Sequence, residues 1–541
     1  MSTPAVPGIA PATGHHAEVD PALLAQPLPA WLDAVRAQVL AGRALAAGGI
    51  LEAALTRFAF DAELWLAASG SREQRGDADG AIELLRELSR RAPGHAAATF
   101  ALARLLSARR AWRAAAQVLV DAFEPRPPAP DLVLRAARLL ADWGDKPAAV
   151  KLAEAALAAG ADDAMLRLYT AALQGQLGAF ERARTLYREA LAGDARTLEL
   201  GAAYGLASIT RYRDPADPDL AHWQDLLQRG QLNPAARASL LFALGKAHDD
   251  LADYAAAARL LREANALVGA GAWSRRNWRR SIDARLARAA LPVREPMRGE
   301  CVPIFIVGAP RSGTTLAAEL LGRSPLVRNR GELDWLPHLA EQVDGLARPT
   351  PAQLESVAQE YLARLRREDA DSGWFIDKQP LNVLHLDLIR ALFPQAPVVV
   401  CRRSARDTAL SLWSQHFEAR DYRFAYDFAD IDAFLRGCAR LVERAQQASA
   451  ARVFVLDYEA LVREPRLQIA RLAQWLGLPA FDCEEAAAAG TSVIGTASLW
   501  QARQPVHARS VGRWRHYAPH LPELLKFDDA AAEQTPHRSM R

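Results

Sequence analysis

The residues best suited to chemistry in this chain lie where an apolar run meets a loop of glycine and small polar side chains. The segment PIFIVGAPRSGTTLAAELLGRS starts at Pro303, and its expected anion-binding residues are Gly308, Arg311, Ser312, Gly313, Thr314 and Thr315. A strand, a tight turn and a helix in this order gather free N–H groups around one point, which favours a bound anion. We therefore predict a phosphate-binding loop with Arg311 as its cation; the alternative is an ordinary glycine-rich turn.

The loop lacks two parts of a nucleoside triphosphate site. Its glycine spacing and Thr315 match the P-loop motif, but Thr314 stands where that motif carries the lysine that reaches the β- and γ-phosphates. No strand ending in a magnesium-binding aspartate is evident, and the cysteines lack metal-site spacing. The loop therefore suits a single phosphate, without a metal.

A second strand–helix junction follows about 90 residues later in the segment PVVVCRRSARDTALSLWSQH. Arg403 leaves the end of the apolar run, and Ser411 lies about two turns into the next helix. Open α/β sheets bind ligands at the carboxyl ends of their strands. We expect Arg403 and Ser411 at the same sheet edge as the phosphate loop.

These two segments, in this order, resemble the cofactor signature of sulfotransferases. In that family the loop holds the 5′-phosphosulfate of 3′-phosphoadenosine 5′-phosphosulfate, and the arginine and serine hold the 3′-phosphate. The resemblance implies transfer of a sulfuryl group from this donor to an acceptor hydroxyl. One position departs from the pattern, because a family arginine four residues beyond Ser411 is Gln415 here.

Further motifs, across roughly residues 303–520, resemble the tyrosylprotein sulfotransferase branch. The Gly-Glu pair in LVRNRGELDWLPHL implies that Glu332 is the catalytic base, and WFIDKQPLNVLHL implies that Lys378 is a cation on the transferred group. Arg311 would be a second cation on the transferred group, beside Lys378. The acceptor implied by this branch is the phenol of a protein tyrosine.

The same resemblance extends the cofactor site toward the C-terminus. RVFVLDYEALVREP implies a cofactor contact from Tyr458, and SLWQARQPVHARSVGRWRHY implies contacts from Ser498 and Arg513.

Each assignment has a less specific alternative. Glu332 could cap the following helix, Lys378 could be a surface lysine, and Tyr458 could pack at the sheet edge. Other residues that could take part, as a base or by stacking on adenine, are Asp377, His507, His516, His520, Trp500 and Trp514.

The first half of the chain repeats with a period of 34 residues. Related segments begin at Gly76, Arg110, Gly144 and Gly178, and a later copy begins at Ala252. In each of the first four segments, the second helix carries a small residue at the same position of the repeat: Ala81, Ala115, Ala149 and Ala183. This period is typical of tetratricopeptide repeats, whose hairpins stack into a solenoid. The longer step to Ala252 predicts an insertion around RDPADPDL.

These patterns predict a fold of class α plus α/β. We expect a flexible N-terminus over 1–35, a tetratricopeptide solenoid over 36–272, and a helix and linker over 273–300. A P-loop-like, three-layer, parallel-sheet sulfotransferase domain should follow over 301–525, with a tail over 526–541. Apolar runs at PIFIVG, PVVVC and RVFVL are its expected strands.

Composition excludes several classes of function. The chain has 541 residues and a formal net charge of +3, without the concentrated basic face of a nucleic-acid binder. It shows no apolar run long enough to span a membrane and no signal peptide, so we expect a cytoplasmic protein.

The expected partner is the acceptor, for example a peptide or protein bound by the repeats. Alternatives are a repeat scaffold with an inactive nucleotide-sensing domain, a small-molecule kinase, and a glycan or small-molecule sulfotransferase. We also expect residues 298–541 to fold without the repeats.

Overall fold

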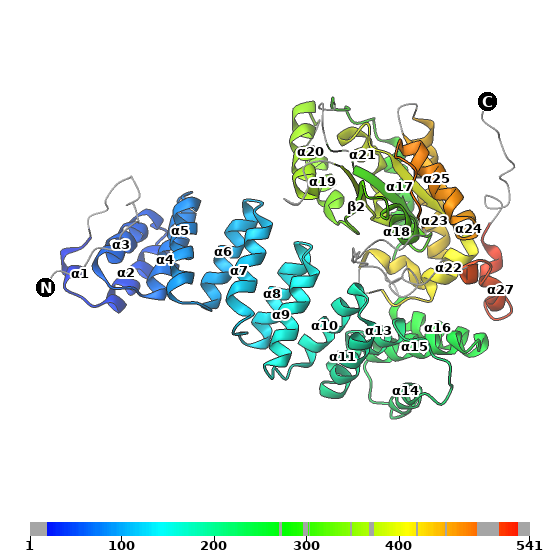
Figure 1. Cartoon of the computed structure of the whole chain (residues 1–541), viewed down its shortest axis with the longest axis horizontal. Coiled ribbons are helices and arrows are strands. Elements are labelled where there is room, and N and C mark those ends of the chain that lie inside the picture. The colour runs from blue at the N-terminus through cyan, green and yellow to red at the C-terminus, as the bar shows by residue number, and fades with distance from the viewer. Residues whose placement is uncertain are drawn as a thin grey trace. The chain divides into compact units, whose positions relative to one another are not determined.

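The computed structural model describes residues 19–269, 273–295, 301, 303–346, 349–366, 373–417, 420–448, 452–483 and 508–528. The chain forms two compact units, Met1–Asp162 and Asp163–Arg541. Figure 1 traces the elements of both.

The described part of the first unit is entirely helical. Its helices are α1 (Pro21–Leu24), α2 (Leu28–Leu40), α3 (Ala44–Arg57), α4 (Ala62–Gln74), α5 (Ala78–Arg91), α6 (Ala96–Ala108), α7 (Trp112–Phe123), α8 (Pro130–Asp142) and α9 (Lys146–Ala158). They pair as antiparallel hairpins, and the buried alanines at 81, 115 and 149 let the two helices of a hairpin approach closely. Helix α2 begins inside the segment expected to be a flexible N-terminus.

The turn position of each hairpin has a left-handed backbone. The first residues of the repeats, Gly76, Arg110, Gly144, Gly178 and Ala252, all have φ between 61° and 89°. Glycine adopts this conformation without a steric penalty. The recurring glycine of the sequence is therefore explained by backbone geometry rather than by binding.

The second unit begins with further helices. They are α10 (Ala164–Leu177), α11 (Phe180–Gly193), α12 (Arg196–Glu199), α13 (Ala202–Ser208), α14 (Pro218–Gln228), α15 (Pro234–Asp250), α16 (Tyr254–Gly269) and α17 (Arg275–Ala287). The predicted insertion is present as the segment that contains α14. Helices α15 and α16 form the last hairpin.

A parallel five-stranded sheet follows. Its strands are β1 (Pro303–Gly308), β2 (Val327–Asn329), β3 (Trp374–Asp377), β4 (Val398–Arg402) and β5 (Val453–Asp457). Their order in the sheet is β2-β3-β1-β4-β5. All ladders are parallel, with Gly308 paired to Cys401 at the carboxyl end of β1. The central strand β1 is completely buried, which explains its uninterrupted apolar sequence.

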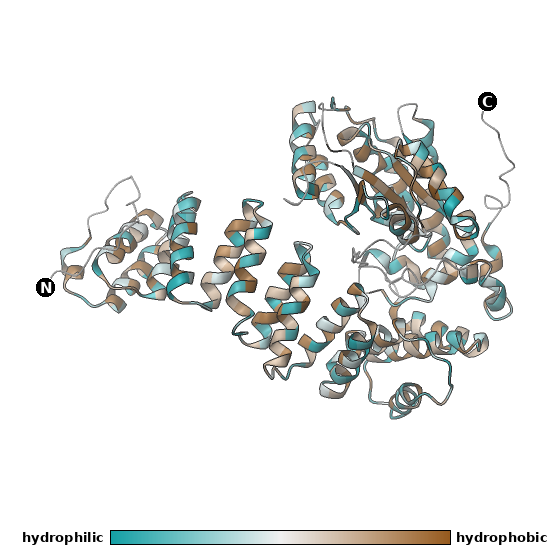
Figure 2. Cartoon of the chain, in the orientation of Figure 1, coloured by the Kyte–Doolittle hydropathy of each residue, from teal (hydrophilic) through white to brown (hydrophobic). Residues whose placement is uncertain are grey.

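Helices cover both faces of the sheet. On one face, α18 (Thr314–Leu321), α24 (Tyr458–Arg463) and α25 (Pro465–Leu476) pack against Ile304, Ile306 and Ile376. On the other, Phe305 packs against Tyr361 of α20 (Pro351–Arg366) and against Phe393, which follows α21 (Leu386–Leu392). Figure 2 shows the apolar strands between helices of mixed polarity.

The remaining elements surround the carboxyl edge of the sheet. They are α19 (Trp335–Asp344), η1 (Pro380–His385), α22 (Ala405–Trp413), η2 (Arg420–Tyr426), α23 (Phe428–Gln447), η3 (Ala508–Ser510), α27 (Trp514–Tyr517) and η4 (Pro522–Lys526).

The predicted fold class is confirmed: a helical repeat region precedes a three-layer parallel-sheet domain. The three expected strands are present, and β2 and β3 were not predicted. The domain limits stay a prediction, since the two compact units meet within the repeats. None of the helices in the described residues is long and apolar enough to cross a membrane.

Candidate active site

Each of the five strands leads to one of the predicted site groups. The phosphate loop follows β1, and the segments after β2, β3, β4 and β5 carry Glu332, Lys378, Arg403 and Tyr458. Because the strands are parallel, all five groups lie at the same edge of the sheet. The strand order separates Glu332 and Lys378, on one side of the loop, from Arg403 and Tyr458 on the other.

The loop passes so close to its neighbours that its two glycines cannot carry side chains. A Cβ added at Gly308 would lie 2.5 Å from the carbonyl oxygen of Cys401, and one at Gly313 would lie 2.4 Å from the ring of Tyr458. Gly313 also has φ 97°. Arg311 has φ 72°, an uncommon backbone conformation for a residue with a side chain.

Buried hydroxyl groups and helix N–H groups line this loop. Ser312, Thr314 and Thr315 are all buried, and the N-cap residue of α18, Gly313, has no side chain to cap the helix. The Oγ of Ser312 has no hydrogen-bond partner among the described residues. An unpaired buried hydroxyl costs free energy unless a ligand supplies a partner. The loop therefore fits an anion such as a phosphate group.

The predicted cations of the cofactor site lie together. Arg311 donates from Nε to Oγ of Ser411 at 3.0 Å, and Arg403 donates from Nη1 to the carbonyl oxygen of Arg311 at 3.0 Å. The guanidinium of Arg403 also lies 4.8 Å from the ring centroid of Tyr458. Tyr458 therefore faces the site rather than only packing at the sheet edge.

Burial of these two arginines disfavours their charge. Burial, with a smaller contribution from the nearby Arg403 guanidinium, lowers the pKa of Arg311 to about 10. Burial also lowers the pKa of Arg403. Two neighbouring buried cations are stabilised when an anion binds between them.

Glu332 and Lys378 form a salt bridge. Lys378 Nζ lies 2.6 Å from Glu332 Oε1, and the lysine side chain is only 4% exposed. Lys378 is therefore not a surface lysine. Helix α19 has Asp334 at its N-cap, so Glu332 does not cap it. Burial raises the pKa of the Cys401 thiol to about 12, and the ammonium of Lys378 partly offsets this rise. Lys378 thus lies within electrostatic range of Cys401 on β4.

A C-terminal segment packs against these arginines. Arg403 donates from Nη2 to the carbonyl oxygen of Ser510 at 2.6 Å. Asp407, buried on α22, accepts hydrogen bonds from the backbone N–H groups of Gly512 at 2.6 Å and Trp514 at 2.9 Å. These contacts place Arg513 within electrostatic range of Arg311 and Arg403, since its charge lowers the pKa of both.

Residues 303–482 match the model of the Sulfotransferase family. They form a sulfotransferase-family domain.

Individual relatives are distant. An uncharacterized protein of Aquifex aeolicus is 28% identical over 58% of this chain and 44% of its own length. Protein-tyrosine sulfotransferase 1 of Danio rerio is 24% identical over 39% of this chain and 65% of its own length. The chain thus spans less than two thirds of these relatives.

A solved sulfotransferase domain from the Synechococcus PCC 7002 olefin synthase is 21% identical, with a TM-score of 0.32. The match covers 44% of this chain and 98% of the solved domain.

Several other predicted residues lie away from the phosphate loop or outside the described part. Ser498, Trp500 and His507 lie outside the described residues. His516 stacks on Tyr254 with ring centroids 4.9 Å apart, and His520 is exposed. The guanidinium groups of Arg406 and Arg515 lie 4.7 Å and 5.1 Å from the ring centroid of Trp514.

The sequence did not predict three residues with a part in or near this site: Asp407, Tyr422 and Asp249. Asp407 lies within a motif already identified, but nothing in the motif indicated its two backbone partners. Burial raises the pKa of Tyr422, the charges of Glu332 and Asp334 raise it further, and Arg311 partly opposes this rise. Asp249, from repeat helix α15, pairs with Arg513 at 2.6 Å. No local pattern could have revealed that contact.

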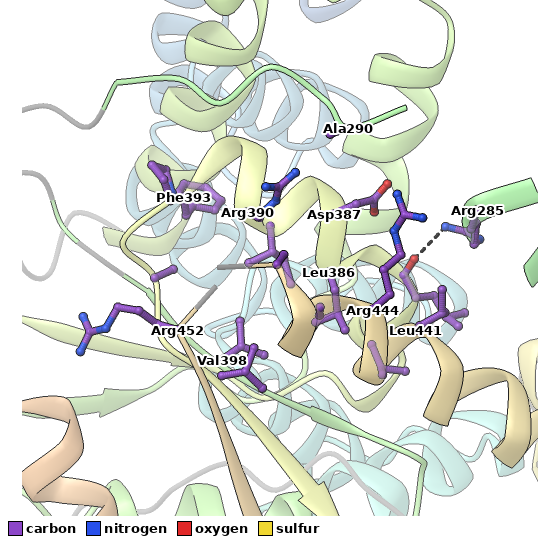
Figure 3. A pocket seen from close by; sticks show the side chains of 18 of the residues that line it. Arg285, Ala290, Leu386, Asp387, Arg390, Phe393, Val398, Leu441, Arg444 and Arg452 are labelled. Carbon is purple, nitrogen blue, oxygen red and sulfur yellow. Dashed lines mark hydrogen bonds between the residues drawn. The ribbon is translucent and has the colours of Figure 1, made fainter. Parts of the chain in front are cut away.

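A cavity lies at the opposite edge of the sheet, where β4 and β5 begin (Figure 3). It has a volume of about 250 Å³ and several arginines at its rim. Arg285, Arg444 and Arg452 donate to backbone carbonyl oxygens, and Arg288 pairs with Asp344. These bonds support a structural role for the arginines, and the cavity is remote from the phosphate loop.

Asp377 points into the core rather than into the site. Its Oδ2 accepts hydrogen bonds from the hydroxyl of Tyr361 at 2.6 Å and from Nδ2 of Asn382 at 3.0 Å. The side chain is fully buried, and burial raises its pKa to about 7. This geometry does not support Asp377 as the base.

We expect Asp377→Asn to keep turnover within about threefold of the wild type, because an acid–base residue contributes far more. The raised pKa means that the folded state favours the protonated carboxyl. The protonated carboxyl therefore contributes to the free energy of unfolding. This contribution is fully present below the pKa of the unfolded chain, near 4, and is lost as the pH rises through about 7. Melting temperatures between pH 4 and 8 should therefore depend less on pH in the variant. A large loss of turnover with normal folding would instead make Asp377 catalytic.

Proposed function

We propose that this chain transfers a sulfuryl group from 3′-phosphoadenosine 5′-phosphosulfate to an acceptor hydroxyl. The observation that carries the proposal is the arrangement at one sheet edge. A loop for a single phosphate lies between a carboxylate–ammonium pair, Glu332 and Lys378, and a second cationic site at Arg403. The loop and Arg403 could bind a donor with two separate phosphate groups, and Glu332 could accept a proton.

The loop residues would hold the 5′-phosphosulfate, and Arg403 with Ser411 would hold the 3′-phosphate. The donor supplies an activated sulfuryl group and leaves as adenosine 3′,5′-bisphosphate. Glu332 would accept the proton of the acceptor hydroxyl. Lys378 and Arg311 would donate hydrogen bonds to the oxygens on which charge develops.

The acceptor class that we favour is the phenol of a tyrosine in a peptide or protein. Support comes from the Gly-Glu and Lys-x-Pro motifs and from the distant similarity to a protein-tyrosine sulfotransferase. The helical repeats offer an extended surface on which a peptide acceptor could bind.

Transfer of labelled sulfate to three acceptor panels tests this choice: tyrosine peptides, glycans and small phenols. We expect the highest kcat/KM for peptides. Preference for glycans would contradict the acceptor class but keep the reaction. Donor binding without transfer to any panel would favour a scaffold with a nucleotide-sensing domain.

Arg403→Ala tests how the 3′-phosphate is recognised. An arginine can form a bidentate, charge-assisted pair with phosphate, and a hydrogen bond to a charged group contributes about 1.5–3 kcal/mol. We expect the affinity for adenosine 3′,5′-bisphosphate to fall by roughly 10–100-fold. Calorimetry should show little change for adenosine 5′-phosphosulfate, which lacks the 3′-phosphate.

Arg402→Ala is the matched control, because Arg402 is adjacent but pairs with Asp457 at 2.7 Å. Its affinities should equal those of the wild type. Equal losses for both ligands in Arg403→Ala would mean that Arg403 supports the loop through the carbonyl oxygen of Arg311 instead of binding the 3′-phosphate.

A further inference from the structure

The last repeat helices contact the elements that follow the phosphate-binding strands. Nδ2 of the buried Asn265, on α16, donates to the carbonyl oxygen of Trp413 at the end of α22, at 3.0 Å. The hydroxyl of Tyr204, on α13, donates to Oε1 of Gln415 at 2.8 Å. Helix α16 also packs against α27, and Figure 1 shows both helices in this unit. The repeats and the sulfotransferase domain therefore share side-chain contacts close to the predicted cofactor site.

Asp249, near the end of α15, makes the most direct of these contacts. Its Oδ1 lies 2.6 Å from Nη2 of Arg513 and 2.7 Å from the hydroxyl of Tyr517. Burial alone would raise the pKa of Asp249, but Arg513, together with Tyr517 and Lys246, outweighs burial and lowers it. The carboxylate thus stays ionised and holds the Arg513 guanidinium in one orientation.

The backbone around Arg513 is fixed separately. Asp407 binds the N–H groups of Gly512 and Trp514, and Arg403 binds the carbonyl oxygen of Ser510. These bonds place the backbone but do not orient the Arg513 side chain. The side chain is held by its salt bridge to Asp249, and its guanidinium also lies 5.6 Å from the ring centroid of Tyr517. A guanidinium has five N–H donors, so a bond to Asp249 leaves others for a phosphate group.

We propose that Asp249, a residue of the repeat region, is a positioning residue that orients Arg513 toward the 3′-phosphate of the donor. The repeat region then completes the cofactor site in addition to any role in binding the acceptor. The inference rests on the proposed function, because it requires that Arg513 meets the donor.

The test compares Asp249→Asn with Asp250→Asn in the full chain. Asp250 is the neighbouring buried carboxylate, but it binds Arg211, Lys246 and the N–H of Tyr212 within the repeats. We expect Asp249→Asn to weaken adenosine 3′,5′-bisphosphate about tenfold and to raise the donor KM similarly, with kcat nearly unchanged. Asp250→Asn should keep the wild-type affinity even if it lowers the melting temperature.

A double-mutant cycle identifies the route of the effect. In an Arg513→Ala background, Asp249→Asn should cause no further loss of affinity. Unchanged or tighter binding in Asp249→Asn, or an equal loss in both backgrounds, would overturn the inference. A wild-type chain that does not bind the bisphosphate would instead contradict the proposed function itself.

If Asp249→Asn fails to fold, Arg513→Ala alone tests the inference, because Asp249 acts through this guanidinium. We expect a loss of bisphosphate affinity of about tenfold or more, since a hydrogen bond to a charged group contributes about 1.5–3 kcal/mol. Wild-type affinity in folded Arg513→Ala would overturn the inference, because Arg513 would then not meet the donor.

Discussion

Replacing Glu332 with glutamine is expected to lower turnover at saturating donor by about 100-fold or more, because the amide cannot accept the proton of the acceptor hydroxyl. Glutamine has the same shape, and its amide oxygen can still accept a hydrogen bond from Lys378. Affinity for adenosine 3′,5′-bisphosphate should change little. Steady-state kinetics and calorimetry on one preparation measure both quantities.

Asp334→Asn is the control for this change. Asp334 is two residues further along and accepts a hydrogen bond from Gln379 at 2.6 Å, which asparagine can keep. We expect turnover within about threefold of the wild type. If Glu332→Gln also stays within that range, the base lies elsewhere.

Replacing Lys378 with methionine is expected to lower turnover by about 10²–10³-fold, the usual effect of removing one preorganised donor to developing charge. Methionine keeps most of the length and apolar volume of the side chain. The change leaves Glu332, which is about a quarter exposed, without its partner, so part of the loss can arise from a displaced carboxylate.

Lys378→Arg separates charge from shape. It keeps a cation next to Glu332, and we expect a smaller loss of turnover than with methionine. Equal losses in folded Lys378→Arg and Lys378→Met, measured with the same donor and acceptor, would contradict the assignment of charge stabilisation to Lys378.

The parts of the site that were predictable follow from local constraints. Gly308 and Gly313 are required because the loop touches β4 and the Tyr458 ring, and such close approaches leave glycine at fixed spacing in the sequence. The buried strands β1, β4 and β5 are marked by apolar runs. Strands β2 and β3 were missed, because three or four residues are too few to show a period.

The parts that were not predictable depend on contacts between distant residues. Asp249 on α15 and Arg513 just before α27 meet where α16, the hairpin partner of α15, packs on α27. Neither residue lies in a local sequence pattern that depends on the other. Gln415 was identified only as a departure from a motif, and its hydrogen bond to Tyr204 is a tertiary contact.

The same contacts bear on the expectation that residues 298–541 fold alone. A chain cut at 298 would lose Asp249, Tyr204 and the buried Asn265, all of which contact the sulfotransferase domain. The compact unit instead begins at Asp163. A chain that starts there keeps every one of these contacts.

We expect the sheet edge to bind a nucleotide with separate 5′- and 3′-phosphate groups, without a metal. Calorimetry of the full chain with adenosine 3′,5′-bisphosphate in EDTA, and with ATP and magnesium, tests it most directly. We predict binding of the bisphosphate and no binding of ATP with magnesium. Binding of ATP with magnesium, and none of the bisphosphate, would contradict the account and favour a phosphotransferase.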